Sequence, residues 1–558
     1  MGNCEGTNMA VGRNDNYWTR NLKRRAVLRA GLIGSVGASA YALVGCGDDG
    51  GSKSAASGSP TAAANATAAA LPKGGSLTAL LASDPTSLDP HFGQGGGDHQ
   101  FFWMIHDNLV NYNQKGELDA SISLAEKWEQ PEPTTITMKL RSGINFHDGT
   151  PFNAAAVKFN IERAQSDKSA AKSQMLAISK VEAISDTDLR LTLNKPNAAI
   201  LTLLGDRGGA IVSPAAVQKH GDQLARNPVG TGKFVFKEWA QSDHILVTRN
   251  PSYWGKDASG TVLPYLDQVR VNIVPDATVQ LANLEAGTVD LVVVLLAGDI
   301  ERFEKSEKFQ VTQSATGIGW SGTYANQSLK PIDDPRLRRA IGRALDKPAI
   351  LKAVQFGRGA VGIGPIAAGT WAFNPSLKGL DLDLAEAKKE LSASGYPDGL
   401  KIEMITINTQ PYLQHSELWK QMLSKIGVDI TIVPLAVAEL TSRTFVKKDA
   451  AMQLAGFSLR ADPDGTVSET LRSDGFYNSG HRPNAELDDL IDKARETYVQ
   501  AERKSFYDKI QQIAIDQVYD WYVYYGFSYA ATPKSILNMG QFYGGETKPR
   551  FGNLAKKA

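Results

Sequence analysis

The residues of this chain that could perform catalysis are neighbouring acids, chiefly Asp462 with Asp464 and Asp333 with Asp334. Two carboxylates held close together can act as general acid and general base. Acids at this spacing are more often turn formers or solvated side chains, and no nucleophile, base and orienting group surrounds them. The chain also lacks a His-Glu-x-x-His motif, a Gly-x-Ser-x-Gly motif and a phosphate-binding loop. The sequence therefore predicts a protein that is not an enzyme, and an exported hydrolase is the less favoured alternative.

Side chains that bind metals are few and scattered. Among the eight histidines, His91, His99 and His106 do not have the spacing of a known ligand motif. Of the two cysteines, Cys4 would be removed with an N-terminal export signal and only Cys46 would remain, which excludes a thiolate cluster and an internal disulfide. The sequence predicts no resident metal and no cofactor.

The elements that must position a binding site alternate irregularly between strands and helices. We expect strands at 74–81, 136–140, 189–193, 246–250 and 289–296, and helices at 154–164, 278–286, 335–345, 383–394, 417–426 and 485–512. Asn153 can cap the first of these helices, and Gly287 can end the second. This mixture predicts α/β lobes. The body after residue 73 has about 485 residues, too many for one core.

The first 45 residues have the features of a secretory signal. Basic residues that include Arg24 and Arg25 precede a weakly apolar run at 30–44, and Leu43-Val44-Gly45-Cys46 ends it. The adjacent arginines resemble a twin-arginine signal, and the last four residues resemble a bacterial lipobox. The run of 15 residues is shorter than the ~20 that a spanning helix needs. We therefore predict cleavage before Cys46 and a lipid anchor on that cysteine.

The mature chain after this cleavage site has a tether and a nearly neutral charge balance. Residues 46–72 are mostly Gly, Ser, Ala and Thr, which predicts a disordered tether. The whole chain has a net charge of +1, and loss of six basic and two acidic residues with the signal leaves −3. Phosphate binding needs a concentrated basic surface, and the mature chain has no basic run. Nucleic acid is therefore not an expected partner.

Five blocks of sequence, taken in order, resemble one known family. They are residues 74–77 with 84–91, residues 145–159 (Asn-Phe-His-Asp-Gly-Thr-Pro-Phe at the start), residues 228–254 (Pro-Val-Gly-Thr-Gly-Lys-Phe at the start), residues 284–290 and residues 326–346. The pattern resembles the extracytoplasmic solute-binding proteins of the peptide/nickel/oligopeptide class of ABC importers, bacterial extracellular solute-binding protein family 5. Most of these residues form turns or pack, so the blocks identify the scaffold and leave the cargo open.

The resemblance implies an α/β fold of two lobes with mixed sheets, an extra subdomain and a hinge of two crossing strands. The expected ranges are 73–326 for lobe I, about 113–225 for its inserted subdomain, 327–525 for lobe II and 526–558 for the return to lobe I. The hinge strands are expected near 321–327 and 525–531. A ligand would enter the open cleft and drive closure of the lobes.

The resemblance also implies partners and a location. The expected protein is a monomer outside the cytoplasm, in the periplasm or on the outer face of the membrane. It is held there by its lipid anchor, and it passes a small molecule or peptide to an ABC permease. The same family includes nickel-chelate and haem binders, which remain alternatives because such a metal can arrive in a small chelator.

One segment departs from the family pattern. In peptide-binding relatives it reads Gly-Trp-x-x-Asp and ends in Asp-Pro, and its acid holds the ammonium group of the ligand. Here Phe457 occupies the aromatic place and Arg460 stands where the acid is expected. A guanidinium would repel an ammonium group and suits bidentate binding of a carboxylate. The alternative is that Arg460 pairs internally with Asp462 or Asp464.

Other candidate ligand contacts come from segments that line the cleft in relatives. They are Gln94 and Asp98 in the first lobe, Trp320 and Ser321 at the expected hinge strand, Trp371 in a loop of the second lobe, and Asp462 beside Arg460. An aromatic ring in a cleft can stack on a ligand, although tryptophan is more often part of a core.

Overall fold

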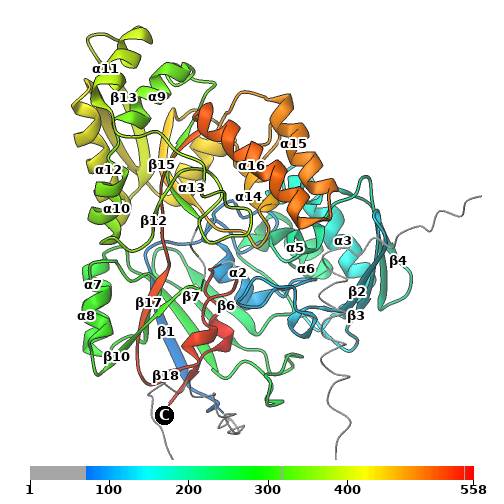
Figure 1. Ribbon diagram of the computed structural model, residues 1–558. Coiled ribbons are helices and arrows are strands. Elements are labelled where there is room, and N and C mark those ends of the chain that lie inside the picture. The colour runs from blue at the N-terminus through cyan, green and yellow to red at the C-terminus, as the bar shows by residue number, and fades with distance from the viewer. Residues whose placement is uncertain (1–70, 316, 318, 546, 558) are drawn as a thin grey trace, which may run out of the picture. The chain divides into compact units, whose positions relative to one another are not determined.

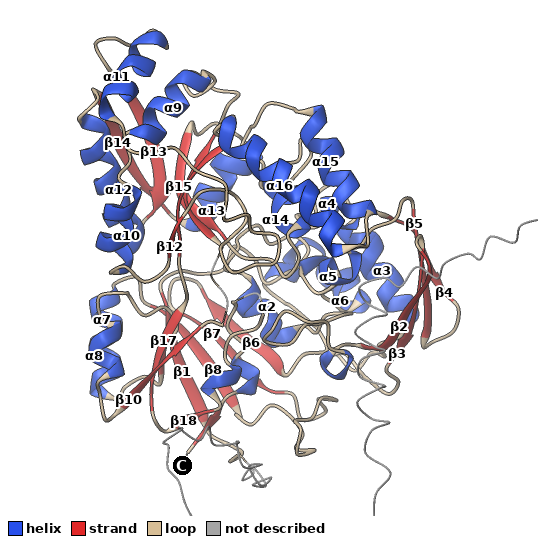
Figure 2. Ribbon diagram, in the orientation of Figure 1, coloured by secondary structure: helices blue, strands red, loops and turns tan. Residues whose placement is uncertain are grey.

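The computed structural model describes residues 71–315, 317, 319–545 and 547–557. The predicted signal and lipidation residues Arg24, Arg25 and Cys46 lie outside the described residues, as does most of the predicted tether. Within the described chain, helices and strands build two large mixed sheets and one smaller antiparallel sheet (Figures 1 and 2).

The first large sheet defines lobe I and has the strand order β10-β17-β9-β1-β8-β7-β6. Strand β1 runs parallel to β8 and β9, and the other neighbours are antiparallel. The bounds are β1 Ser76–Leu81, β6 Phe234–Ala240, β7 His244–Arg249, β8 Gln268–Ile273, β9 Leu291–Val292, β10 Phe309–Gln313 and β17 Tyr529–Pro533. The early β1 and the late β17 share this sheet, so the chain leaves lobe I and returns to it (Figure 1).

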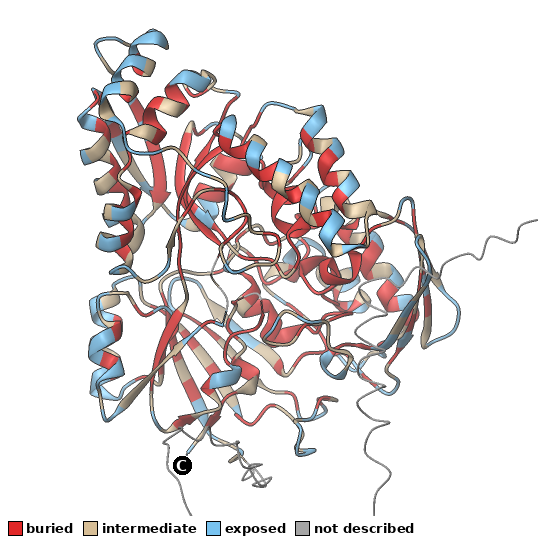
Figure 3. Ribbon diagram, viewed as in Figure 1, coloured by how far each residue is buried: buried red, intermediate tan, exposed pale blue. Residues whose placement is uncertain are grey.

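The second large sheet defines lobe II and has the strand order β12-β16-β11-β15-β13-β14. The bounds are β11 Trp320–Ala325, β12 Ala360–Val361, β13 Leu400–Ile407, β14 Val428–Leu435, β15 Met452–Phe457 and β16 Asp520–Tyr525. Strand β13 is parallel to β14 and β15, whereas β11 is antiparallel to β15 and β16. All six residues of β11 and of β16 are buried (Figure 3).

The first crossing between the sheets lies earlier than predicted. The chain passes from β10 to β11 between Gln313 and Trp320 and returns from β16 to β17 between Tyr525 and Tyr529. The predicted outward hinge at 321–327 falls mostly within β11. That prediction is wrong because β11 has hydrogen-bonded strands on both sides, which makes it an interior strand of lobe II.

The third sheet, β2-β3-β5-β4, is antiparallel throughout and has its own hydrophobic core. Its strands are β2 Ala125–Glu132, β3 Thr135–Leu140, β4 Ile178–Ala183 and β5 Asp188–Leu193. We call residues 113–225 the insert, because this sheet and its helices fall in the range expected for the inserted subdomain. Asn153 caps α3 as predicted, since its side chain accepts a hydrogen bond from the Ala156 backbone at 3.0 Å.

The helices and remaining short elements surround these sheets. The α-helices are α2 His99–Ile105, α3 Ala154–Ala164, α4 Lys172–Met175, α5 Ile200–Leu203, α6 Pro214–His220, α7 Ala277–Ala286, α8 Ile300–Glu304, α9 Pro335–Arg343, α10 Lys347–Gln355, α11 Leu384–Ala393, α12 Gln410–Ser424, α13 Val437–Thr441, α14 Asp464–Thr470, α15 Ala485–Glu496 and α16 Gln500–Asp516. Single turns are η1 Ala120–Ile122, η2 Arg207–Gly209, η3 Gly221–Ala225, η4 Ser442–Val446, η5 Met539–Gln541 and η6 Phe551–Asn553, and β18 Ile536–Leu537 pairs with β19 Ala555–Lys556.

Three predicted elements differ from the structure. The apolar run at 289–296 contributes only the two residues of β9 to the sheet, and beyond them Val294 is 54% exposed. The predicted long helix at 485–512 is two packed helices, α15 and α16, because Thr497 is extended and its hydroxyl donates to the Lys493 carbonyl at 2.7 Å. The helix predicted at 417–426 begins earlier, as α12.

Candidate functional site

Arg460 lies in the loop between β15 and α14 and is 8% exposed. Its aliphatic stem packs on Gly465, where an added Cβ would stand 3.0 Å from the Cβ of Arg460. Its guanidinium carbon lies 4.7 Å from the centre of the Phe457 ring, which is a cation–π distance. Gly465 therefore leaves room for the stem of Arg460, and the Phe457 ring lies beside its guanidinium.

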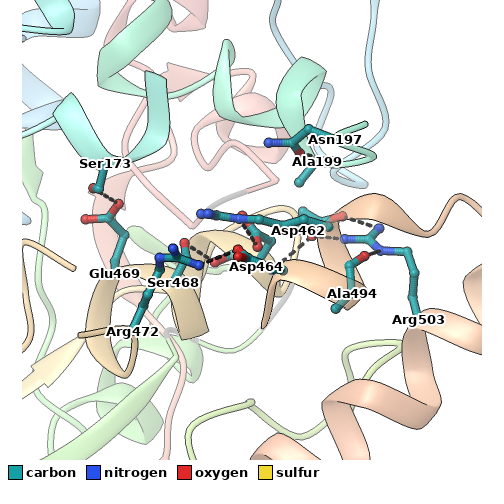
Figure 4. Close-up of polar contacts among 12 residues, drawn as sticks. Ser173, Asn197, Ala199, Asp462, Asp464, Ser468, Glu469, Arg472, Ala494 and Arg503 are labelled. Carbon is teal, nitrogen blue, oxygen red and sulfur yellow. Dashed lines mark hydrogen bonds and ion pairs between the residues drawn. The ribbon is translucent and has the colours of Figure 1, made fainter. Parts of the chain in front are cut away.

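The two acids that follow Arg460 are paired with other arginines, so they are not the internal partners that the alternative interpretation assigned to Arg460. Asp462 accepts two hydrogen bonds from Arg503, at 2.7 and 2.9 Å. Asp464 accepts one from Arg495 at 2.7 Å. Both pairs lie within lobe II, and Figure 4 shows the guanidinium of Arg503 directed at Asp462. This arrangement leaves Arg460 to find its partner outside lobe II.

That partner is Asp206 of the insert. The Nε atom of Arg460 and the Oδ2 atom of Asp206 lie 3.2 Å apart, close enough for an ion pair, yet neither atom forms a hydrogen bond within the described chain. The Oδ1 atom of Asp206 lies 2.5 Å from Nε2 of His99. Burial opposes ionisation of Asp206, but the charge of Arg460 and the contact with His99 outweigh it and hold the pKa of Asp206 well below its usual value.

A small cavity of about 30 Å³ lies beside Arg460. In its present form it has room for one or two water molecules. Its walls include four residues proposed from the sequence, namely Trp320, Trp371, Phe457 and Arg460. The indole Nε1 of Trp320 is buried without a hydrogen-bond partner in the described chain. The cavity therefore combines aromatic walls with unfilled hydrogen-bonding capacity, as ligand pockets do, but it is about tenfold smaller than the ~300 Å³ at which such pockets begin.

Other predicted contacts, Asp98 and Ser321, are not among the residues that line this cavity. The carboxylate of Asp98 accepts hydrogen bonds from the backbone and hydroxyl of Thr86, at 2.7 and 2.5 Å, and from the Gly95 backbone at 3.0 Å. The Ser321 hydroxyl donates to the Ala455 carbonyl within the lobe II sheet, at 3.4 Å. Asp98 and Ser321 therefore serve the fold in this structure.

The lobes also meet through contacts that the sequence did not indicate. The Tyr477 hydroxyl of lobe II donates to the backbone carbonyl of Gln94 in lobe I at 3.0 Å. The Ser173 hydroxyl of the insert donates to Oε1 of Glu469 on α14 at 2.7 Å (Figure 4), and Oε2 of Glu469 is buried without a partner in the described chain. Burial raises the pKa of Glu469 to about 7. No motif marks Asp206, Glu469 or Ser173 in the sequence.

A cluster of Ser479, His481 and Asp520 bears on the hydrolase alternative. Nε2 of His481 lies 3.0 Å from Asp520 and 3.4 Å from the Ser479 hydroxyl. A catalytic triad uses different ring nitrogens for the acid and the serine, and its serine must reach substrate. Here both contacts use one nitrogen, and Ser479 is only 1% exposed. The cluster is a buried structural network, which includes the hydrogen bond from the Ala325 backbone to Asp520 at 3.0 Å.

In the described part of the chain, no group of three or more His, Cys, Asp or Glu side chains has the arrangement of a metal site. Among the same residues, no helix combines the length and apolar character needed to cross a bilayer.

Comparison with known proteins identifies the scaffold. Residues 121–479 match the family model described as bacterial extracellular solute-binding proteins, family 5 Middle. The glutathione-binding protein GsiB of Shigella dysenteriae is 27% identical over 450 residues, which cover 78% of this chain and 86% of GsiB.

Solved structures show the same fold. The periplasmic binding protein DppA from Helicobacter pylori, in complex with the peptide STSA, superposes with a TM-score of 0.80 at 25% identity, covering 87% of this chain and 99% of DppA. The binding protein AgaA from A. tumefaciens, in complex with agropinic acid, has a TM-score of 0.79 at 25% identity, with coverages of 87% and 99%.

Proposed function

Because the chain belongs to the bacterial extracellular solute-binding proteins of family 5, we propose that it is the lipid-anchored solute-binding component of an ABC importer. It captures a small peptide-like or carboxylate-bearing solute between its lobes without changing the bonds of that solute. It then delivers the solute to a membrane permease. Lobe closure supplies the contacts that distinguish the loaded protein from the empty one.

The observation that supports a carboxylate is the state of Arg460. Its guanidinium borders the cavity, and its Nε atom donates no hydrogen bond within the described chain. A buried guanidinium has five donors and matches a carboxylate in bidentate geometry. GsiB, DppA and AgaA are named for or solved with glutathione, a peptide and agropinic acid, which all carry a carboxylate.

The anchor and the export route rest on the sequence before residue 71. Arg24 and Arg25 would direct export, and Cys46 would carry several acyl chains, which hold a protein more firmly than one. We expect Cys46→Ser to release the protein from the membrane fraction while solute binding by the folded body stays unchanged. Wild-type protein in the soluble fraction would contradict the anchor.

The ligand class is tested by native mass spectrometry of the purified protein, followed by calorimetry with the solute that copurifies. We expect Arg460→Ala to weaken binding of a carboxylate-bearing solute at least tenfold. Arg336→Ala is the matched control, because Arg336 is half exposed on α9 and pairs with Asp334 far from the cavity. Unchanged affinity in Arg460→Ala would remove the assigned role, and recovery of a chemically altered solute would show that the protein is an enzyme.

A further inference from the structure

Asp206 has one carboxylate oxygen in contact with the insert and lobe I and the other directed at lobe II. The Oδ1 atom accepts a hydrogen bond from the Arg207 backbone at 2.8 Å and lies 2.5 Å from His99 Nε2. The Oδ2 atom stands 3.2 Å from Arg460 Nε without forming a hydrogen bond. The residue is therefore fixed by one oxygen and offers the other across the boundary between the lobes.

The charged groups around this contact are two arginines and three buried acids. Arg460 and Arg207 are the cations, and Asp206, Asp98 and Glu469 are the acids. Burial raises the pKa of Asp98, and it raises the pKa of Glu469 to about 7, so Asp206 is the acid whose charge is held most firmly. The guanidinium of Arg207 is committed to the carbonyl oxygens of Gly93 and Gly95, so it is not free to turn toward Asp206.

His99 adds no charge to these groups at neutral pH. Burial lowers its pKa to about 3, so the ring is neutral there. Its two ring nitrogens face oxygen acceptors, Asp206 on one side and the Gly96 carbonyl at 3.1 Å on the other, and a neutral ring can donate to only one of them. The direct countercharge of Asp206 is therefore Arg460.

A solute carboxylate that binds Arg460 must compete with Asp206 for it. If the solute brought only its negative charge, Asp206 and the solute would be two anions in a desolvated site with one available cation, which is strongly unfavourable. A solute that also carries a cation restores the balance, because its cation takes Asp206 while its carboxylate takes Arg460. The cation of such a solute would bind Oδ2 of Asp206, and its carboxylate would bind Nε of Arg460; neither atom forms a hydrogen bond in the described chain.

We propose that Asp206 is a specificity-determining residue, which makes the site select compact zwitterions over anions; this inference rests on the proposed function. The two protein charges are in contact, so the two ligand charges must also be close together, as in the ammonium and carboxylate of an α-amino acid unit. The rest of the solute would lie against the aromatic walls of the cavity, Trp320, Trp371 and Phe457. The lobes must part to admit it, because the present cavity holds only water-sized groups.

The experiment uses the full chain and a set of matched probes: glutathione, free amino acids and di- and tripeptides, each with its N-acetylated and C-amidated form. A thermal-shift screen selects the probe that stabilises the wild type most, and calorimetry then measures its three forms. We expect the N-acetylated form to bind at least tenfold more weakly than the free form. In Asp206→Asn we expect the free form to weaken at least tenfold and the N-acetylated form to bind at least tenfold more tightly than it binds the wild type.

Asp206→Glu keeps the negative charge, and we expect it to keep the preference for the free form of the probe. This variant also keeps the inference testable if Asp206→Asn fails to fold. Equal binding of free and N-acetylated probes by the wild type would overturn the inference, as would failure to bind any zwitterion in the set. Binding of the N-acetylated probe with uptake of one proton more than the free probe takes up would also overturn it, because His99 would then supply the missing charge. The proposed function fails separately, if C-amidation and Arg460→Ala leave the affinity unchanged.

Discussion

Two buried arginine–aspartate pairs near the cavity differ in construction. Arg503 holds Asp462 with two hydrogen bonds, and both residues belong to lobe II. Arg460 and Asp206 come from different parts of the fold and approach to 3.2 Å without a hydrogen bond. Each pair removes two charges from water, which is favourable overall only if the geometry compensates for the lost hydration.

The difference distinguishes a pair that stabilises the fold of lobe II, Arg503–Asp462, from a pair that takes part in the proposed binding site, Arg460–Asp206. The Arg503–Asp462 pair stays intact whether the lobes are open or closed, so its geometry can be optimised once. Under the proposed opening of the lobes, the Arg460–Asp206 pair would break and its partners would regain water. An imperfect contact suits that role, because it can be exchanged for contacts with a solute at little cost.

The variant Arg503→Ala tests this difference between the two pairs most directly. The change leaves the Asp462 carboxylate buried without its cation, and we expect it to lower the free energy of unfolding by about 3–5 kcal/mol. Arg460→Ala should cost about 1 kcal/mol or less, because opening of the lobes lets Asp206 reach water. Urea denaturation followed by circular dichroism measures both, and equal losses would show that the two pairs have the same role.

A second prediction concerns pH and the Ser173–Glu469 contact between the lobes. Burial raises the pKa of Glu469 to about 7 against an ordinary 4.5, while Arg460 and Arg495 oppose this only in part. Closure therefore takes up a proton between these values. Affinity for solute should be highest below pH 4.5, fall as the pH rises to about 7, and level off above it.

Glu469→Gln isolates this effect, since His99 and Asp206 titrate equally in both proteins. The wild type should lose roughly fortyfold more affinity than the variant between pH 5 and pH 7, measured by calorimetry in matched buffers. Parallel pH profiles would show that Glu469 is not exposed by opening.

The smallest expected effect is that of Ser173→Ala. It removes one hydrogen bond between the lobes, which is worth about 1 kcal/mol, or roughly a fivefold loss of affinity for solute. Ser179→Ala is the control, because Ser179 is exposed on β4 of the same insert and donates only to the Thr192 carbonyl at 3.0 Å. A loss as large in the control would mean that the insert is destabilised rather than that a contact between the lobes is missing.

Much of the local structure could be predicted from short stretches of sequence. Helix α3 begins after its Asn153 cap, and α7 ends at Gly287, which has the left-handed conformation with φ of 73°. Such capping signals depend only on residues within about one helical turn of each other in the sequence. The extent of β9 and the break between α15 and α16 were missed, because apolar periodicity reports burial and does not show where a segment leaves a sheet or turns back.

The proposed binding residues divide in the same way. Arg460, Phe457, Trp320 and Trp371 line the cavity, and each was proposed because it stands in a segment that the family resemblance places near the cleft. Asp98 and Ser321 were proposed on the same grounds but are used within lobe I and lobe II, respectively. Position near a cleft does not reveal which way a side chain points.

By itself the sequence determined the scaffold, the absence of a recognisable catalytic motif and the presence of an arginine at position 460. The tertiary structure alone decided what that arginine faces. Asp462 and Asp464 are its neighbours in the chain, but Arg503 and Arg495 bind them, and the carboxylate opposite Arg460 is that of Asp206. Charges pair through space, and the fold brings Asp206 to Arg460 from a distant part of the chain, so no local pattern could reveal the pairing.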